Sequence, residues 1–143
     1  MVDLSSKARL DRAIELMYFG FKRLVQEPDR VLARRGLSRV HHRLLYFIAR
    51  RPGLSVGELL RALEVSKQAV NLPLRTLLRQ GLARSEADRR DGRIRRLRLT
   101  ARGAALEATL SGLQHAHLTR VFAAAGKTAE RGWREVMAGM GGR

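Results

Sequence analysis

The stretch LSVGELLRALEVSKQAV, residues 54–70, constrains the fold more than any other part of the sequence. Ser55 and Glu58 have the S-x-x-E spacing of a capping box, which satisfies free backbone groups at the start of a helix. That short helix ends near Leu63, and a second capping residue, Ser66, follows almost at once. Two short helices joined so closely must cross steeply, which predicts a helix-turn-helix.

Hydrophobic residues recur at helical spacing before this motif. Over residues 6–25 they follow steps of three and four, which predicts one apolar face of a helix. Pro28 suits the first turn of a helix, so a separate short helix is expected over residues 29–35. A further helix, with Ser38 as its expected N-cap, leads into the motif.

The second helix of the motif is expected to run from Lys67 to Gln80, with Val70 and Leu74 facing the core. Pro73 lies in its interior. A proline there costs roughly 3 kcal/mol, because it removes a backbone donor and its ring crowds the preceding turn. The helix therefore either kinks at Pro73 or is shorter than its pattern indicates.

The hydrophobic period changes after this helix. In residues 94–99 leucines alternate with arginines, which is typical of a half-buried strand. Residues 82–87 are the expected antiparallel partner, across an Asp-Arg-Arg-Asp-Gly-Arg tip. Two strands alone are marginally stable, so the hairpin is expected to pack on the helices. Two helices follow, one from the N-cap Thr100 to Ala125 and one over residues 128–140.

Basic charge is concentrated on the helix-turn-helix and the hairpin. The sequence has 29 Lys and Arg against 13 Asp and Glu, a net charge of +16. Residues 37–100 hold 15 of these basic residues and 5 acidic ones, and seven arginines crowd residues 84–98. A helix-turn-helix fits the major groove of B-DNA, and an arginine-rich hairpin beside it can reach phosphates and the minor groove. Double-stranded DNA is therefore the expected partner.

The hairpin and the residues after it carry two motifs that resemble those of a known family. The tip has a D-x-R-D-x-R pattern and the following residues have L-T-x-x-G, formed by Asp88, Arg90, Asp91 and Arg93 and by Leu99, Thr100 and Gly103. With the helix-turn-helix before them, these motifs make the sequence similar, over essentially its whole length, to the MarR (multiple antibiotic resistance regulator) family of winged-helix transcription factors.

The resemblance implies a mainly α-helical fold with a small β-hairpin. Within one continuous structural domain, residues 1–36 would form an N-terminal dimerisation helix and connector, residues 37–100 a winged helix-turn-helix DNA-binding lobe, and residues 101–143 the C-terminal dimerisation helices. The resemblance further implies a homodimer that binds a pseudo-palindromic operator as a sequence-specific transcriptional regulator. The expected activity is repression, relieved by a small lipophilic or aromatic ligand, and no cofactor is expected.

The residue types in the DNA-binding lobe indicate roles for individual side chains. The amides of Gln68 and Asn71 can pair with adenine, and Leu72 can touch a thymine methyl group. The predicted contacts of the recognition helix are Ser66, Lys67, Gln68, Asn71, Leu72 and Arg75. The predicted contacts of the wing are Arg84, Arg89, Arg90, Arg93, Arg95 and Arg96. Arg84, Arg95 and Arg96, together with Arg98, are expected to set affinity through phosphates.

The resemblance adds three further assignments. Arg90 is the wing residue expected to enter the minor groove. Asp88 and Asp91 are expected to orient neighbouring arginines. An effector pocket is expected between the dimerisation and DNA-binding parts, with walls formed by Met17, Tyr18, Phe21, His41, Leu45 and His117.

Two other functions account for a strongly basic chain. A non-specific architectural DNA-binding protein would use the same charge without base-reading amides, and its affinities for operator and random DNA would be equal. A module that binds an anionic membrane surface or another protein would show no preference for a duplex.

Several classes of site are not expected. The sequence has no cysteine, which excludes disulfides and thiolate zinc sites and favours the cytoplasm. No apolar run is long enough for a signal peptide or a membrane span. The pairs His41, His42 and His115, His117 lack the three- or four-residue spacing that aligns metal ligands on a helix. No Walker loop, G-x-S-x-G or H-E-x-x-H motif suggests an enzyme.

Overall fold

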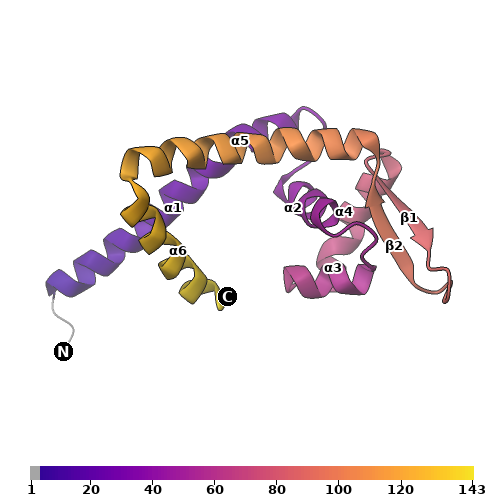
Figure 1. Ribbon diagram of the computed structural model, residues 1–143, viewed down its shortest axis with the longest axis horizontal. Helices are drawn as coiled ribbons and strands as arrows, with labels where there is room; N and C mark the ends of the chain where they lie inside the picture. Colours follow the sequence, from indigo (N-terminus) through magenta and orange to yellow (C-terminus); the bar gives the residue numbers. More distant parts are fainter. Residues whose placement is uncertain (1–3) are drawn as a thin grey trace. The chain divides into compact units, whose positions relative to one another are not determined.

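The computed structural model describes residues 4–143, which fold into six α-helices and one two-stranded antiparallel sheet (Figure 1). The helices are α1 (Leu4–Ala33), α2 (Arg39–Arg50), α3 (Val56–Leu63), α4 (Lys67–Arg79), α5 (Ala101–Ala125) and α6 (Lys127–Gly141), and the strands are β1 (Ala83–Ala87) and β2 (Arg95–Leu99). The predicted fold class, mainly helical with one hairpin, is confirmed. The first three residues of the predicted segment 1–36 lie outside the described residues.

The described residues divide into two compact units. The winged unit is Gln26–Ser111, and the terminal unit consists of the residues up to Val25 together with Gly112–Arg143. Within residues 4–143, no helix combines the length and the apolar character that crossing a lipid bilayer requires.

The hydrophobic core of the winged unit lies between the three short helices and the hairpin. Leu44 and Ile48 of α2, Leu59 of α3 and Leu77 of α4 are completely buried, and Leu97 of β2 is 1% exposed. The burial of Leu97 agrees with the half-buried strand expected from the alternation in residues 94–99. The core thus fixes the orientation of α4 and of the hairpin within this unit.

Two serine caps define the helix-turn-helix. The Ser55 hydroxyl accepts a hydrogen bond from Glu58 N at 3.1 Å, and the Ser66 hydroxyl accepts one from Ala69 N at 3.3 Å. Between the two helices Glu64 takes a left-handed conformation with φ of 54°, which turns the chain sharply after α3. The predicted helix-turn-helix is therefore confirmed.

The first helix differs from its prediction, because α1 continues through Pro28 to Ala33 instead of breaking into two helices. A proline already has a helical φ and removes a single backbone donor. Here that loss is offset by packing, since Pro28 and Leu32 are both fully buried. The separate helix predicted over residues 29–35 is wrong for this reason.

The α4 helix also continues through its proline. It extends from Lys67 to Arg79 with Pro73 inside, so the alternative of a shorter helix is wrong. Val70, Leu74 and Leu77 are buried along this length, and their burial holds both halves of the helix on the core.

The hairpin rests on the chain that precedes α3 as well as on the core. Strands β1 and β2 pair antiparallel, with Ser85 opposite Leu97. On the other side of β2, Leu97 N donates to Leu54 O at 2.9 Å, and Gly53 N donates to Leu97 O at 2.8 Å. The segment Gly53–Ser55 thus acts as a short third strand, which supplies the support that two strands alone lack.

The L-T-x-x-G motif joins the hairpin to α5. The Thr100 hydroxyl donates to Gly81 O at 2.6 Å and accepts from Gly103 N at 3.1 Å, which confirms Thr100 as a capping residue. A Cβ atom at position 103 would lie 1.8 Å from the Leu82 carbonyl oxygen. Glycine is therefore required for this close approach of the helix to the chain.

Candidate nucleic-acid interface

The outward face of α4 presents the side chains predicted for base reading. Lys67, Gln68, Asn71, Leu72 and Arg75 are all exposed, while the opposite face of the helix is buried. Within residues 4–143 no hydrogen bond or ion pair occupies the four polar side chains among them. Their donors and acceptors are therefore available to an external partner.

These free groups match the edges of bases in the major groove. The amides of Gln68 and Asn71 can each make two hydrogen bonds to adenine, and Lys67 and Arg75 can bind guanine or phosphate. Because α4 continues through Pro73, Arg75 stays on the same exposed face as Gln68 and Asn71. Ser66 has a structural task as the N-cap of this helix.

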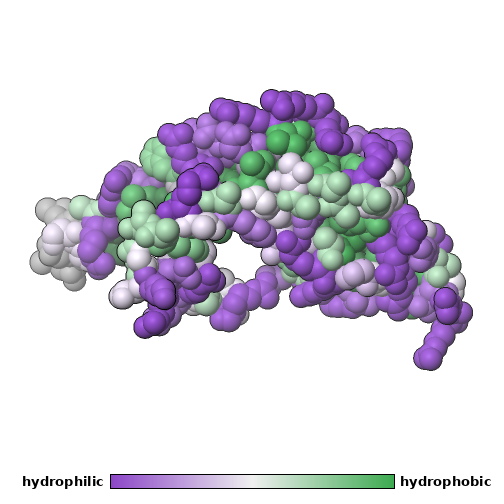
Figure 2. Space-filling model, turned by 45° about the horizontal axis from the view of Figure 1, so that its top comes forward, coloured by the Kyte–Doolittle hydropathy of each residue, from purple (hydrophilic) through white to green (hydrophobic). Residues whose placement is uncertain are grey.

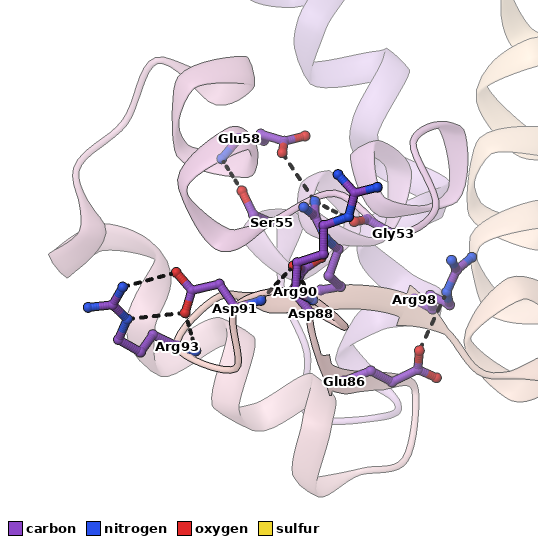
Figure 3. Close-up of polar contacts among 10 residues, drawn as sticks. Gly53, Ser55, Glu58, Glu86, Asp88, Arg90, Asp91, Arg93 and Arg98 are labelled. Atoms are coloured by element: carbon purple, nitrogen blue, oxygen red, sulfur yellow. Dashed lines mark hydrogen bonds and ion pairs between the residues drawn. The ribbon is translucent and has the colours of Figure 1, made fainter.

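One carboxylate, that of Asp88, organises the tip of the wing (Figure 3). Its Oδ2 atom accepts hydrogen bonds from Arg90 N and Asp91 N, both at 3.1 Å. Its Oδ1 atom accepts from Arg96 Nε at 2.9 Å. The bond from Arg96, helped by the two backbone bonds, lowers the pKa of Asp88. The carboxylate therefore stays ionised and holds the turn to strand β2.

A second carboxylate, Asp91, holds the far side of the tip. It accepts bonds from Arg93 Nε at 3.1 Å and from Arg93 N at 3.0 Å, and the side-chain bond is the main reason that the pKa of Asp91 is lowered. The two aspartates thus contact the arginines near them, while their part in DNA binding stays a prediction.

Arg96 has three partners inside the protein, although the sequence suggested a phosphate contact. Besides Asp88, its guanidinium donates to Glu58 Oε1 and to Gly53 O, each at 3.3 Å. The bond to Asp88 raises the pKa of Arg96. These contacts join the wing to the start of α3, and they occupy the Nε and Nη1 atoms of a side chain that is 34% exposed.

Glu58 was missed as part of the wing by sequence reasoning. Its S-x-x-E spacing indicated a carboxylate that caps the start of α3, yet the carboxylate lies 3.3 Å from Arg96 and only the backbone N–H of Glu58 contacts Ser55. The partner is 38 residues away along the chain, and no local pattern indicates such a pair.

The other wing arginines fall into two groups. Arg89 and Arg90 are exposed, and among the described residues neither guanidinium has a hydrogen-bonding or ion-pair partner. The second group is paired on the surface, where Arg84 contacts Glu86 at 3.2 Å and Arg95 donates to Ser85 at 2.9 Å. Hydrophilic residues cover the hairpin tip, at the lower right of Figure 2. The two wing arginines without a partner among the described residues, Arg89 and Arg90, thus both lie at the tip.

The terminal unit has a different surface, an apolar groove of about 890 Å³. Segments of α1, α5 and α6 line it, with Leu16, Leu118 and Trp133 among the contributors. Several large hydrophobic side chains of this unit are more than half exposed in the single chain, namely Leu10, Ile14, Leu16, Tyr18, Phe19, Val136 and Met140. An isolated soluble protein rarely exposes so much apolar surface in one region.

The predicted effector residues divide between the two units. Met17, Phe21 and His117 line the apolar groove of the terminal unit. Tyr18 is not among its lining residues and is 59% exposed. Leu45 is completely buried in the core of the winged unit.

The remaining predicted pocket residue, His41, has a structural contact in the winged unit. Its Nδ1 atom accepts from Ser38 N at 2.9 Å, which closes one half of a cap at the start of α2. No described residues form a group of three His, Cys, Asp or Glu side chains suited to a metal ion.

A buried polar cluster in the winged unit was also missed from the sequence. His42, 7% exposed, contacts the Ser111 hydroxyl at 3.3 Å, and the neighbouring Glu107 carboxylate accepts a hydrogen bond from Arg50. The guanidinium of Arg50 also stacks 3.5 Å from the centre of the Tyr46 ring. Burial is the largest cause of a lowered pKa at His42, which keeps the ring neutral at neutral pH.

Comparison with known proteins gives consistent matches. A family model described as the MarR family matches residues 35–94. The HTH-type transcriptional regulator PetP of Rhodobacter capsulatus is 42% identical over 132 residues, which cover 92% of this chain and 80% of the relative.

Two solved structures cover nearly all of the chain. FabT of Streptococcus pneumoniae, in complex with DNA, has a TM-score of 0.79 at 16% identity and covers 94% of each chain. The protein Rv2887 of Mycobacterium tuberculosis, in complex with p-aminosalicylic acid, has a TM-score of 0.61 at 29% identity and covers 89% of this chain and 96% of that one.

Proposed function

The chain belongs to the MarR family of transcriptional regulators, and on that premise we propose that it is a homodimeric repressor that binds a pseudo-palindromic operator. The observation that carries the proposal is the pairing, within one unit, of unoccupied base-reading side chains on α4 with unoccupied arginines at the wing tip. Base contacts supply sequence specificity and phosphate contacts supply affinity, so the two surfaces are complementary parts of one DNA-binding lobe.

The proposed roles of individual side chains follow from which polar groups have no partner among the described residues. Gln68 and Asn71 read bases in the major groove, and Lys67 and Arg75 bind guanine or phosphate beside them. Arg90 enters the minor groove, whose negative potential attracts arginine, and Arg89 binds the neighbouring backbone. The bonds from Arg90 N and Asp91 N to Asp88 hold the backbone of the tip turn in one conformation, which lowers the entropy lost on binding.

The apolar groove of the terminal unit supports the proposed homodimer. A second copy would bury exposed side chains such as Leu16, Trp133 and Met137, which the single chain leaves in contact with water. Two-fold symmetry then pairs two lobes with half-sites about one helical turn apart, roughly 10 bp centre to centre. Occupation of the operator excludes polymerase, which is the proposed basis of repression in the cytoplasm.

A small aromatic or lipophilic ligand is the proposed signal that ends repression. Met17, Phe21 and His117 are its proposed contacts, because these predicted residues line the same apolar groove, which the ligand and the second copy would therefore share. The similarity to Rv2887, whose structure contains p-aminosalicylic acid, favours an aromatic acid. Trp133 also lines the groove and is the only tryptophan, so its fluorescence should respond when salicylate is titrated into the protein.

A binding titration tests the DNA-binding proposal. Duplexes selected from a random pool are compared with unselected duplexes at one fixed salt concentration. We expect the selected sites to bind on the order of a thousandfold more tightly. The Asn71→Ala variant should lose about 1–3 kcal/mol, mainly at one base pair of the selected site. Equal affinity for both pools would overturn the proposal and favour a non-specific architectural protein.

A further inference from the structure

Leu72 is a large hydrophobic residue on the otherwise polar exposed face of α4. Its side chain is 65% exposed, the largest fraction recorded for a large hydrophobic residue within residues 4–143. The other exposed large hydrophobic residues of the winged unit, Tyr46 and Ile94, are each 37% exposed, and the Tyr46 ring is covered by Arg50. Leu72 belongs neither to the core nor to the apolar groove of the terminal unit. Its side chain is therefore available to a partner outside the chain.

The position of Leu72 on α4 narrows the choice of partner. It follows Gln68 by four residues and precedes Arg75 by three, so the three side chains share one helix face. Asn71 is its neighbour on that face. An apolar spot surrounded by unoccupied amides and cations is poorly suited to another protein's hydrophobic surface, because contact would bury these polar groups without partners. It is well suited to a surface that alternates apolar groups with hydrogen-bonding groups.

Only one base places an apolar group in the major groove, namely thymine with its C5 methyl group. The adenine paired with that thymine presents the donor and acceptor that a Gln or Asn amide recognises. Gln68, Asn71 and Leu72 are therefore jointly complementary to A·T base pairs, and the four-residue spacing lets them reach neighbouring positions. This reasoning rests on the proposed DNA-binding function and specifies which bases it reads.

We propose that Leu72 is a specificity-determining residue that packs against a thymine methyl group, and that the base pairs beneath the N-terminal half of α4 are A·T pairs. The methyl contact selects thymine over cytosine at one position of each half-site. Because Leu72 is mostly exposed, its removal leaves the hydrophobic core intact, so the contact can be tested without unfolding the lobe.

The test uses the full chain and duplexes selected from a random pool. Each thymine of a selected site is replaced in turn by deoxyuridine, which removes only the C5 methyl group and preserves base pairing. For the wild-type protein we expect one position in each half-site at which this change weakens binding about fourfold, the factor for burying one methyl-sized group. The Leu72→Ala variant should bind the unmodified site about fourfold or more weakly and should be insensitive to deoxyuridine at that position.

The matched control is Ile94→Ala, which shortens the other exposed aliphatic side chain of the same unit. This variant should keep the full sensitivity to deoxyuridine. Circular dichroism confirms that both variants retain their helical content. If no deoxyuridine substitution affects wild-type binding, or if Leu72→Ala keeps the sensitivity, the inference is overturned while the DNA-binding proposal stands. A random pool that yields no preferred sequence would instead overturn the DNA-binding proposal itself.

Discussion

Asp88 and Arg96 are joined side chain to side chain, with Oδ1 of Asp88 2.9 Å from Nε of Arg96, while Oδ2 accepts two backbone N–H groups of the tip. One carboxylate therefore fixes both the shape of the turn and its attachment to strand β2. The Asp88→Ala change removes all three bonds and leaves the tip flexible. If the ordered tip falls to about a third of the population, apparent DNA affinity falls about threefold.

The direction of the change in DNA affinity of Asp88→Ala shows whether Asp88 acts by ordering the tip or through its charge. Removing an acidic residue from a DNA-binding surface strengthens binding if charge alone matters. Glu86→Ala is the control, since Glu86 contacts Arg84 and Arg98 on the strand surface but makes no bond to the tip. Fluorescence anisotropy at fixed salt should show weaker binding for Asp88→Ala and unchanged or tighter binding for Glu86→Ala. Tighter binding by both variants would contradict the ordering role.

Arg90 and Arg96 should differ in the salt dependence of DNA binding. Arg90 has a free guanidinium, so Arg90→Ala should reduce the slope of log K against log salt by about 0.9 if one phosphate contact is lost. Arg96→Ala should weaken binding through the wing yet leave that slope unchanged, because the guanidinium is held by Asp88 and Glu58. Titrations between low and moderate salt measure both slopes. A reduced slope for Arg96→Ala would show that Arg96 does contact a phosphate.

Gly103→Ala should destabilise the protein. The added Cβ atom would meet the Leu82 carbonyl oxygen at 1.8 Å, so the start of α5 must move away from the chain. Overpacking of this kind costs about 1–3 kcal/mol, which corresponds to a decrease in Tm of roughly 3–10 °C. Gly112→Ala is the matched control on the same helix, because a Cβ atom there has open space. Alanine favours the helix, so this control should have an equal or higher Tm.

His42 should make stability depend on mildly acidic pH. Its pKa in the folded state lies below the ordinary value of 6.5, chiefly because it is buried. The unfolded chain therefore binds a proton first as pH falls below 6.5, and stability decreases down to the folded pKa, by up to about 1.4 kcal/mol per pH unit. Tm measured from pH 7.5 to pH 5 should fall less steeply for His42→Gln than for the wild type.

The lowered pKa values of His41 and of two aspartates also affect the dependence of stability on pH. Burial also lowers the pKa of His41, so part of the slope should persist in His42→Gln. The lowered pKa values of Asp88 and Asp91 act in a more acidic range, because their stabilisation is present above 3.8 and is lost below it. Identical slopes for His42→Gln and the wild type would show that His42 does not control this dependence.

Met137→Asp should dissociate the proposed dimer. Met137 lines the apolar groove and is 37% exposed, so a carboxylate there would be buried without a partner when two copies meet. Thr128→Asp adds the same charge at an exposed position of the same helix, outside the groove. Sedimentation equilibrium should show a monomer for Met137→Asp and a dimer for Thr128→Asp. A dimer in both variants would place the interface elsewhere.

Features set by neighbouring residues could be predicted from the sequence. Ser55, Ser66 and Thr100 act on backbone groups three residues ahead, so their spacing alone indicates the helix starts. The alternation around Leu97 indicates the strand for the same reason. The exposed face of α4 then follows from helical geometry once Val70 and Leu74 are assigned to the core.

Features that depend on distant residues could not be predicted. Glu58 reaches Arg96 across 38 positions, and His42 reaches Ser111 across 69, so no local spacing marks either contact. The helix break predicted near Pro28 is wrong for a similar reason. The tendency of proline to end a helix is local, whereas the burial that keeps α1 continuous comes from tertiary packing.

The short third strand formed by Gly53–Ser55 holds the hairpin in place within the winged unit. It connects the wing through main-chain bonds to the residue that caps α3, so the hairpin is tied directly to the first helix of the helix-turn-helix. In the proposed complex with DNA, these bonds would hold the wing tip at a set distance from the groove that α4 reads. In the proposed homodimer, a ligand that releases DNA while these bonds persist would therefore act by changing how the two lobes are spaced and oriented.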